Sequence, residues 1–368
     1  MRRLLAVTAC TALGILIYAL RIDIASQGIG VVLSDLVASV IDNTGYPIAL
    51  ESEPLQLTST GKRPVVVTET GLTVCNSAGK TVIEERTAGQ NAVAVSAGRY
   101  LLCYLRGGYE LWLRSGETLL FTQQFDQPIY TAALAENGVI AVSTAAVGDQ
   151  SQVVVYDSSF EECFVWRSSD RVIHALALNP AGTRLAVGGV EYAGGVLSSA
   201  FSVFEIADAA AEPRCEVLLE DELLLAMAFT GEDPATVVTD RAVHSIAANG
   251  DRRGTYFYEG MPLAAFAIDR ERGVLLALGD YAASHNLTLV RLDRQVRETA
   301  TGLCDQRVKS LHFYGEEALA FVGERVLRYS AGLERQGSIE TPDALCCTVI
   351  GSQLYYATMN RLDRAPIR

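Results

Sequence analysis

Residues 172–189, VIHALALNPAGTRLAVGG, contain two short apolar runs on either side of the turn-forming segment Asn179-Pro180-Ala181-Gly182. Short apolar runs separated by a turn of this composition are typical of a β-hairpin. Similar phrases recur as AVAVSAGRYLLCYL, TAALAENGVIAVST, AMAFTGEDPATVVTD, AFAIDRERGVLLALGD, SLHFYGEEALAFVG and CTVIGSQLYYAT, and a weaker first copy, PLQLTSTGKRPVVVTET, begins at Pro54. This repetition decides the predicted architecture.

Most of these hairpins are followed by a third strand and then a fourth, as in QVVVYD with ECFVWR and LTLVRL with QVRETA. The repeat unit is therefore four strands, and units start near residues 54, 91, 129, 173, 223, 263, 307 and 344. A period of roughly 36 to 50 residues with four strands per unit is typical of propeller blades. One such sheet cannot cover both of its apolar faces, so the units must stack around an axis. Small Ala and Val residues dominate the first strand of each unit, which suits the crowded centre of a ring.

The last unit ends after its third strand, NRLDRAPI, and lacks a fourth. The segment YPIAL at 46–50 precedes the first unit and can supply the missing strand. Closing the ring in this way removes two exposed sheet edges. We therefore predict an all-β, eight-bladed β-propeller over residues 45–368, with seven blades as the alternative if the first copy is misread.

The N-terminus reads MRRLLAVTACTALGILIYALRID and is uncharged from Leu4 to Leu20. As a helix this stretch spans roughly 26 Å, a little less than a bilayer core. We predict that residues 1–24 form a cytoplasmic stub and an uncleaved transmembrane signal anchor, with a cleaved signal peptide or a buried core helix as alternatives. Arg2 and Arg3 before the stretch, against Arg21 after it, favour a single-pass protein of the cell membrane with an extracytoplasmic propeller.

Residues 25–44 carry apolar side chains at 29, 32, 33, 36, 37, 40 and 41. Spacings of three and four predict one apolar helix face, so this segment is expected to be an amphipathic helix or linker. An extension of the anchor helix is the alternative.

The composition indicates a folded protein without a nucleic-acid interface. The chain is 49% hydrophobic and 20% charged, with a formal net charge of −13 and a pI near 4.9. Nucleic-acid binding depends on clustered Lys and Arg, and no such cluster is visible in the sequence.

The sequence contains no recognisable catalytic or metal-binding motif, so we expect no enzyme activity, metal or cofactor. The four histidines fall in separate units without metal-ligand spacing: His174, His244, His285 and His312. The eight cysteines show no CxxC pair and are expected to be free thiols, mostly buried. If the domain is extracytoplasmic, a disulfide between distant cysteines such as Cys304 and Cys346 is the alternative.

Three connections between second and third strands are predicted to be long, at 145–151, 190–199 and 280–286. In a propeller these connections share one face. Aromatic side chains in exposed loops are reasonable binding anchors. We therefore nominate Tyr109, Tyr192, Tyr281 and His285 as candidate binding residues; loops of this length that merely tolerate insertions are the alternative.

The sequence resembles bacterial propellers with WD40-like repeats of unknown function that are tethered by one N-terminal helix. The resemblance covers essentially the whole chain and is carried by LLAVTACTALGILIYAL, GYPIALES, LTVCNSAGK and VVVYDSS. Tyr156-Asp157 and Leu292-Asp293 are the nearest equivalents of the Trp-Asp pair of WD40 blades, and the upstream Gly-His is missing. This departure bears on the WD40 hydrogen-bonded tetrad rather than on the propeller. The resemblance implies no catalytic residue.

Together these features predict a non-enzymatic, membrane-anchored platform that binds a protein partner at the cell envelope. One alternative is an envelope sensor that binds a glycan or peptide on the long-loop face. A carbohydrate-active enzyme is the other, and it would need two carboxylates converging at the mouth of the central channel.

Overall fold

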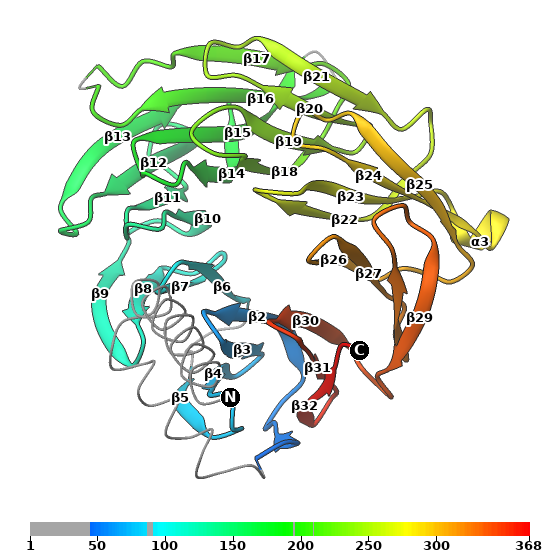
Figure 1. The fold of residues 1–368 in the computed structure, drawn as a ribbon. Coiled ribbons are helices and arrows are strands. Elements are labelled where there is room, and N and C mark those ends of the chain that lie inside the picture. The colour runs from blue at the N-terminus through cyan, green and yellow to red at the C-terminus, as the bar shows by residue number, and fades with distance from the viewer. Residues whose placement is uncertain (1–44, 87–90, 194–195, 209) are drawn as a thin grey trace, which may run out of the picture.

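Eight four-stranded antiparallel sheets surround a common axis in the computed structural model of the protein, which describes residues 45–86, 91–193, 196–208 and 210–368 (Figure 1). Each sheet is one blade, and the first strands of neighbouring blades pack around the axis. The predicted eight-bladed, all-β propeller is confirmed, and the seven-bladed alternative is wrong.

The strands of blades 1 to 4 are β2 (Pro54–Thr60), β3 (Arg63–Thr68), β4 (Gly71–Cys75), β5 (Thr81–Arg86), β6 (Ala92–Ala97), β7 (Tyr100–Leu105), β8 (Glu110–Ser115), β9 (Thr118–Gln124), β10 (Ile129–Leu134), β11 (Ile140–Thr144), β12 (Ser151–Tyr156), β13 (Glu162–Ser168), β14 (Val172–Leu178), β15 (Arg184–Ala193), β16 (Val196–Glu205) and β17 (Cys215–Leu219).

The strands of blades 5 to 8 are β18 (Leu224–Phe229), β19 (Ala235–Thr239), β20 (Ala242–Ile246), β21 (Arg252–Phe257), β22 (Leu263–Asp269), β23 (Gly273–Leu278), β24 (Leu287–Leu292), β25 (Glu298–Cys304), β26 (Ser310–Tyr314), β27 (Glu317–Phe321), β28 (Arg325–Tyr329), β29 (Arg335–Glu340), β30 (Cys346–Ile350), β31 (Gln353–Ala357), β32 (Arg361–Pro366) and β1 (Ile48–Ala49). The single-turn helix α3 (Tyr281–Ser284) lies between β23 and β24.

The predicted anchor at residues 1–24 and the predicted helix or linker at 25–44 lie outside the described residues. Across the ranges that the structure describes, no helix combines the length and the apolar character that crossing a membrane requires.

The ring is closed by the strand that precedes the first blade, as the sequence predicts. In the last blade β1 pairs antiparallel with β32, with Ile48 opposite Leu362. The Leu50 amide donates to the Asn360 carbonyl over 2.8 Å. Figure 1 shows the result, with the last blade (red) beside the first blade (blue).

Tyr46 fixes the start of the closing strand. Its ring packs edge-on against Tyr355, with centroids 5.5 Å apart, and the Arg364 guanidinium lies 4.7 Å from its centroid. Its hydroxyl donates to the Asn76 carbonyl over 3.2 Å. The side chain thereby joins the last blade to a turn of the first.

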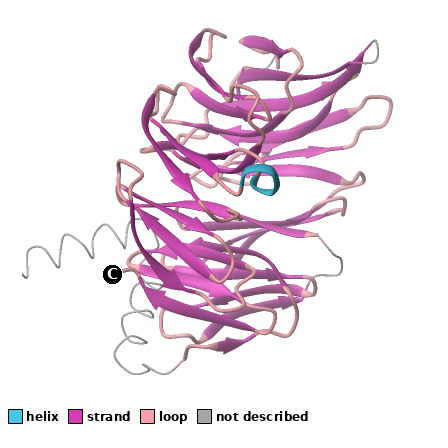
Figure 2. Ribbon diagram, turned by 90° about the vertical axis from the view of Figure 1, so that its right-hand side faces the viewer, coloured by secondary structure: helices cyan, strands magenta, loops and turns pink. Residues whose placement is uncertain are grey.

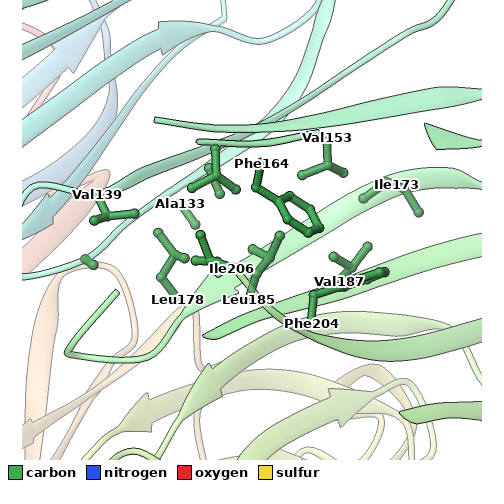
Figure 3. Close-up of a cluster of buried hydrophobic side chains, with 13 residues drawn as sticks. Ala133, Val139, Val153, Phe164, Ile173, Leu178, Leu185, Val187, Phe204 and Ile206 are labelled. Atoms are coloured by element: carbon green, nitrogen blue, oxygen red, sulfur yellow. The ribbon is translucent and has the colours of Figure 1, made fainter. Parts of the chain in front are cut away.

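The apolar core lies between neighbouring blades, and Figure 3 shows the cluster between blades 3 and 4. Phe164 of β13 packs against Phe204 of β16, with ring centroids 5.6 Å apart. Val153 and Leu185 are fully buried in the same cluster. Burying an aliphatic or aromatic side chain of this kind contributes roughly 1.5–3 kcal/mol. Each blade therefore depends on both of its neighbours.

Hydrogen bonds reinforce the contacts between blades. The Ser199 hydroxyl accepts from the Leu224 amide over 2.9 Å, which joins blade 4 to blade 5. The Gln56 side-chain amide bridges blade 1 to blade 2: it donates to the Ala94 carbonyl over 2.8 Å and accepts from the Ala94 amide over 3.0 Å. These bonds satisfy backbone groups of the inner strands that have no partner strand on that side.

Because the strands alternate in direction, each connection belongs to one of two faces, and Figure 2 shows the ring turned by 90° from the view of Figure 1. We call long-loop face the face built by the second-to-third and fourth-to-first strand connections, and turn face the opposite one. The chain enters the ring at the turn face, because Gly45 packs against Gly79 in the β4–β5 turn. A Cβ at Gly45 would lie 2.1 Å from the Ala78 carbonyl oxygen, so this entry requires glycine.

Replacing Tyr46 with alanine should lower the free energy of unfolding by about 2–3 kcal/mol, because the ring contacts and the hydrogen bond to blade 1 are lost. Denaturant unfolding followed by circular dichroism measures the change. Tyr109→Ala, which removes an exposed tyrosine, is the control and should shift stability by less than about 0.5 kcal/mol. Equal effects of the two substitutions would contradict the closing role of Tyr46.

Candidate interaction face

Exposed apolar side chains are concentrated on the long-loop face. Among the described residues, the large hydrophobic side chains exposed at or next to this face are Leu55, Tyr109, Val147, Leu197, Leu218, Leu225, Phe257, Leu303 and Met359. Only Leu119 and Leu120 of that exposed set lie near the turn face. Val147, in the β11–β12 connection, is 83% exposed. Exposed apolar groups gathered on one side of a molecule mark interaction surfaces.

Tyr109, Tyr281 and His285 all lie on the long-loop face. Tyr109 is 47% exposed in the β7–β8 connection of blade 2. Tyr281 begins α3 in blade 6, is partly buried, and packs perpendicular to His285 with ring centroids 5.8 Å apart. His285 is exposed and ends the helix in a left-handed conformation, φ 57°.

The connection predicted as a long loop at 190–199 is an extended hairpin, so that part of the prediction is wrong. Strands β15 and β16 continue to Ala193 and Val196, and Tyr192 pairs with Leu197. The Tyr192 side chain and the turn at 194–195 lie outside what the structure describes. Two adjacent glycines are typical of a two-residue hairpin turn, and this signal favours continued pairing over a loop.

The four candidate residues are distributed over three blades. Tyr109 belongs to blade 2, Tyr192 to blade 4, and Tyr281 and His285 to blade 6. Tyr281 and His285 contact each other, whereas whole blades separate them from the other two. Strand alternation puts the connections next to these residues on one face, and the role of the residues as binding anchors stays a prediction.

Arg171 holds the extended hairpin in place on this face. Its guanidinium Nε lies 2.9 Å from a Glu191 carboxylate oxygen of β15, and Nη1 lies 2.8 Å from a Glu216 oxygen of β17. Only 12% of the Arg171 side chain is exposed, and its hydrogen bonds to Glu216 and Glu191 raise its pKa. Arg171 is largely buried and ion-paired, and it links the β13–β14 connection to β15 and β17.

Blade 5 carries a pocket on the long-loop face that sequence reasoning missed. Its volume is about 650 Å³, and its lining residues are Asp240, Arg241, Phe257, Tyr258, Glu259, Gly260, Met261 and Pro262. Phe257 ends β21 and is 56% exposed. The buried Tyr258 hydroxyl lies 3.2 Å from the Thr239 carbonyl and 3.0 Å from the Ala242 carbonyl, which fixes the pocket wall. Phe257 is the last residue of an outer blade strand with no distinctive sequence pattern, so the sequence offered no signal for its role.

A buried polar network links the segments of the blade that carries this pocket. A Glu222 carboxylate oxygen lies 2.8 Å from His244 Nε2 and accepts from the Thr239 hydroxyl over 2.6 Å. His244 Nδ1 lies 3.1 Å from the Thr255 hydroxyl. The network joins the β17–β18 connection to strands β19, β20 and β21, and His244 has no exposed surface. It therefore positions the blade rather than offering a reactive group to solvent.

The inner strands, which are the first strands of the eight blades, contain one carboxylate, Asp269 of β22, which pairs with Arg272 at 3.0 Å near the turn face. These strands therefore supply no carboxylate pair for sugar hydrolysis.

The inner strands of blades 1, 3, 4, 5 and 6 carry a β-bulge near the long-loop face. Bulges re-aim a side chain, and the bulged residues here are Leu55, Tyr130, His174, Leu225 and Ala264.

The long-loop face is acidic. The acidic residues of its connections are Glu51, Glu53, Glu69, Asp126, Asp149, Asp170, Glu220, Asp221, Glu222, Asp240, Glu259, Asp280, Asp305, Glu324 and Asp343, and the basic ones are Arg106, Arg171, Arg241, Arg307 and Lys309. Much of the net negative charge of the chain therefore lies on this face, which disfavours phosphate-bearing partners.

The described cysteines are all free, so the disulfide considered between Cys304 and Cys346 is wrong. Cys304 is buried in the core between blades 6 and 7, whereas Cys346 lies on β30 of blade 8. Cys163, near the turn face, is the exposed thiol among the described cysteines. Within the described ranges no three His, Cys, Asp or Glu side chains come together as a metal site.

Cys347 and His312 form a contact that lacks the charges of a catalytic pair. His312 Nε2 lies 3.5 Å from Cys347 Sγ and 2.9 Å from the Ser310 hydroxyl. Burial lowers the pKa of His312 to about 4 and raises the pKa of the Cys347 thiol to about 12. Thiol nucleophiles react as thiolates, so this neutral pair is a packing contact.

Comparison with known proteins places the chain in a family. Residues 46–254, from the closing strand into β21, match a family described as "Family of unknown function (DUF5711)". The chain belongs to this family. None of the curated proteins matches this DUF5711 chain.

Solved structures show which fold the DUF5711 chain shares. It is similar to the C-terminal WD40 domain of Sif2, with 11% identity, a TM-score of 0.64, and coverage of 87% of this chain and 97% of that chain. It is also similar to the dihydro-heme d1 dehydrogenase NirN in complex with DHE, with 12% identity, a TM-score of 0.59, and coverage of 86% and 75%. Kuenenia stuttgartiensis hydrazine synthase gives 11% identity, a TM-score of 0.51, and coverage of 87% and 97%.

These identities show the fold alone, which is a WD40-like β-propeller. Because the similar structures include a WD40 domain and enzymes, the fold does not by itself decide between binding and catalysis.

Glu222→Ala in the DUF5711 chain should lower the free energy of unfolding by about 2–4 kcal/mol, because it leaves His244 and Thr239 buried without their shared acceptor. Glu222→Gln keeps an acceptor and should cost less. Glu220→Ala, at an exposed neighbouring position, is the control. If Glu220→Ala and Glu222→Ala have the same unfolding midpoint, the network contributes nothing.

His312 should make the DUF5711 propeller less stable in mild acid. The unfolded chain protonates this imidazole near its ordinary pKa of 6.5, whereas the folded protein does so only near 4. Stability from the neutral imidazole is therefore complete above about pH 6.5 and falls by up to about 3 kcal/mol as the pH drops to 4.

Unfolding midpoints between these pH values measure the effect. His312→Gln should flatten the pH dependence, and His285→Gln, at an exposed histidine, should leave it unchanged. Parallel pH profiles for the parent and His312→Gln would contradict the assignment.

Proposed function

We propose that this protein is a membrane-anchored interaction platform that presents its long-loop face to a protein partner at the cell envelope. The observation that carries the proposal is the concentration of exposed apolar side chains on that face. Propeller domains commonly serve as interaction scaffolds, and we recognise no catalytic constellation among the residues that the structure describes.

The path of the chain supports an orientation for this platform. The ring is entered at the turn face, where Gly45 packs against the β4–β5 turn. An anchor within the preceding residues would hold the turn face toward the membrane. The long-loop face, with its acidic and exposed apolar residues, would then point away from the lipid and be open to a partner.

Site-specific photo-crosslinking in the native membrane tests the platform. A photoreactive amino acid at Val147 should capture a defined partner, because this side chain is 83% exposed on the long-loop face. The same amino acid at Leu119, which is 46% exposed near the turn face, is the matched control. Capture of the same protein with equal yield from both positions, or from neither, would contradict the proposal.

The anchor has a separate test. Ile15→Arg combined with Leu16→Arg places two charges in the uncharged stretch and should move the full-length protein from the membrane fraction to the soluble fraction. Ser26→Arg with Gln27→Arg, just beyond the stretch, is the control. Retention of the first variant in the membrane fraction would remove the anchor from the account.

The side of the membrane is read from Cys163. If the propeller is extracytoplasmic, a membrane-impermeant thiol reagent should label Cys163 in intact cells, since this thiol is exposed. Cys163→Ser should abolish the labelling. Labelling that appears only after the cells are broken would place the propeller on the cytoplasmic side.

A further inference from the structure

The pocket of blade 5 combines an apolar floor with fixed walls. Phe257 is 56% exposed, and its ring stands perpendicular to His244 at 6.5 Å between centroids. Met261 and Pro262 complete the apolar lining. Because His244 is held by Glu222, the Phe257 ring has a rigid support behind it. A pocket that is already shaped binds without the cost of ordering it first.

Carboxylates surround this apolar floor. Asp240 and Glu259 belong to the lining and are exposed. The Asp240 carboxylate also accepts from the Leu223 amide over 2.7 Å, which fixes its position. Arg241 is the basic group of the lining, and its guanidinium lies 3.4 Å from Asp221 of the neighbouring connection. The exposed Glu220 adds a further negative charge next to Asp221.

The charges that line the pocket indicate which kind of ligand it binds. Arg241 is matched by Asp221, so Asp240 and Glu259 leave the rim negative. A phosphate-bearing or acidic molecule is repelled, whereas a cationic group gains Coulomb energy at the rim. A volume of about 650 Å³ exceeds one side chain and accommodates an apolar residue together with its neighbours in a chain.

We propose that this pocket binds an exposed basic segment of the partner protein, with one aromatic or aliphatic side chain packed on Phe257 and flanking Lys or Arg residues paired with Asp240 and Glu259. The inference deepens the proposed function, on which it rests, by naming the chemistry of the partner. It also singles out blade 5 among the blades of the long-loop face.

A peptide library provides the test. The full-length protein, held in detergent, is immobilised and panned with a phage-displayed library of random dodecapeptides. Enriched peptides should carry net positive charge and an aromatic or aliphatic residue between basic ones. A synthetic peptide of the enriched sequence should then bind more weakly as the salt concentration rises.

Two variants assign this binding to blade 5. Phe257→Ser should weaken binding of the synthetic peptide about tenfold or more, as loss of an aromatic anchor does. Glu259→Lys should also weaken peptide binding and should reduce the salt dependence of that binding. The matched controls are Leu119→Ser and Glu161→Lys, at exposed apolar and acidic positions near the turn face. Thermal unfolding of each variant verifies that it is folded.

The outcomes separate this inference from the proposed function. Enrichment of acidic or uncharged peptides, no enrichment, or binding unchanged by both Phe257→Ser and Glu259→Lys overturns the inference. If the peptides bind and are lost with Val147→Ser or Tyr109→Ser instead, the long-loop face remains an interaction face and blade 5 is the wrong site. Failure of the Val147 photo-crosslink overturns the platform itself.

Discussion

The packing of each blade against its two neighbours is the interaction on which the rest of the structure depends. A four-stranded sheet with two apolar faces is stable only when both are covered, and Phe164 against Phe204 shows how one interface is filled. This arrangement succeeds only if the ring closes. The pairing of β1 with β32 completes the last blade, and it brings residues from the two ends of the described chain into one sheet.

The path of the incoming chain distinguishes the two faces. Because the chain enters beside the β4–β5 turn, the long-loop face is left opposite the incoming chain. Connections on that face can lengthen without disturbing the blades, as the β23–β24 connection does with α3, and strands can extend there, as β15 and β16 do. Because the apolar core lies between the blades, Val147 and Phe257 can be exposed on this face without loss of core packing. The packed sheet faces of each blade thus provide stability, and the connections on the long-loop face provide the proposed binding surface.

Hydrophobic periodicity was enough to predict the blades, their starting points and the closing strand, because these features depend on local alternation and on the need to cover sheet edges. The 190–199 segment was misread because a longer pair of strands and a long loop differ only in whether backbone groups pair. The blade 5 pocket could not be predicted from sequence. Phe257 and Met261 lie in one segment, but the pairing of β20 with β21 brings Asp240 beside them, and none of the three has a distinctive local pattern.

An engineered disulfide between β1 and β32 is the sharpest test of ring closure by the incoming strand. Ala49 and Arg361 lie opposite each other where β1 meets β32, so Ala49→Cys with Arg361→Cys should form an intramolecular bond in the full-length protein under mild oxidation. The oxidised chain should migrate faster than the reduced chain on a denaturing gel, whereas variants with only Ala49→Cys or only Arg361→Cys should show no such shift. Failure of the pair to form this bond, or formation of bonds only between molecules, would contradict a ring closed by its own incoming strand.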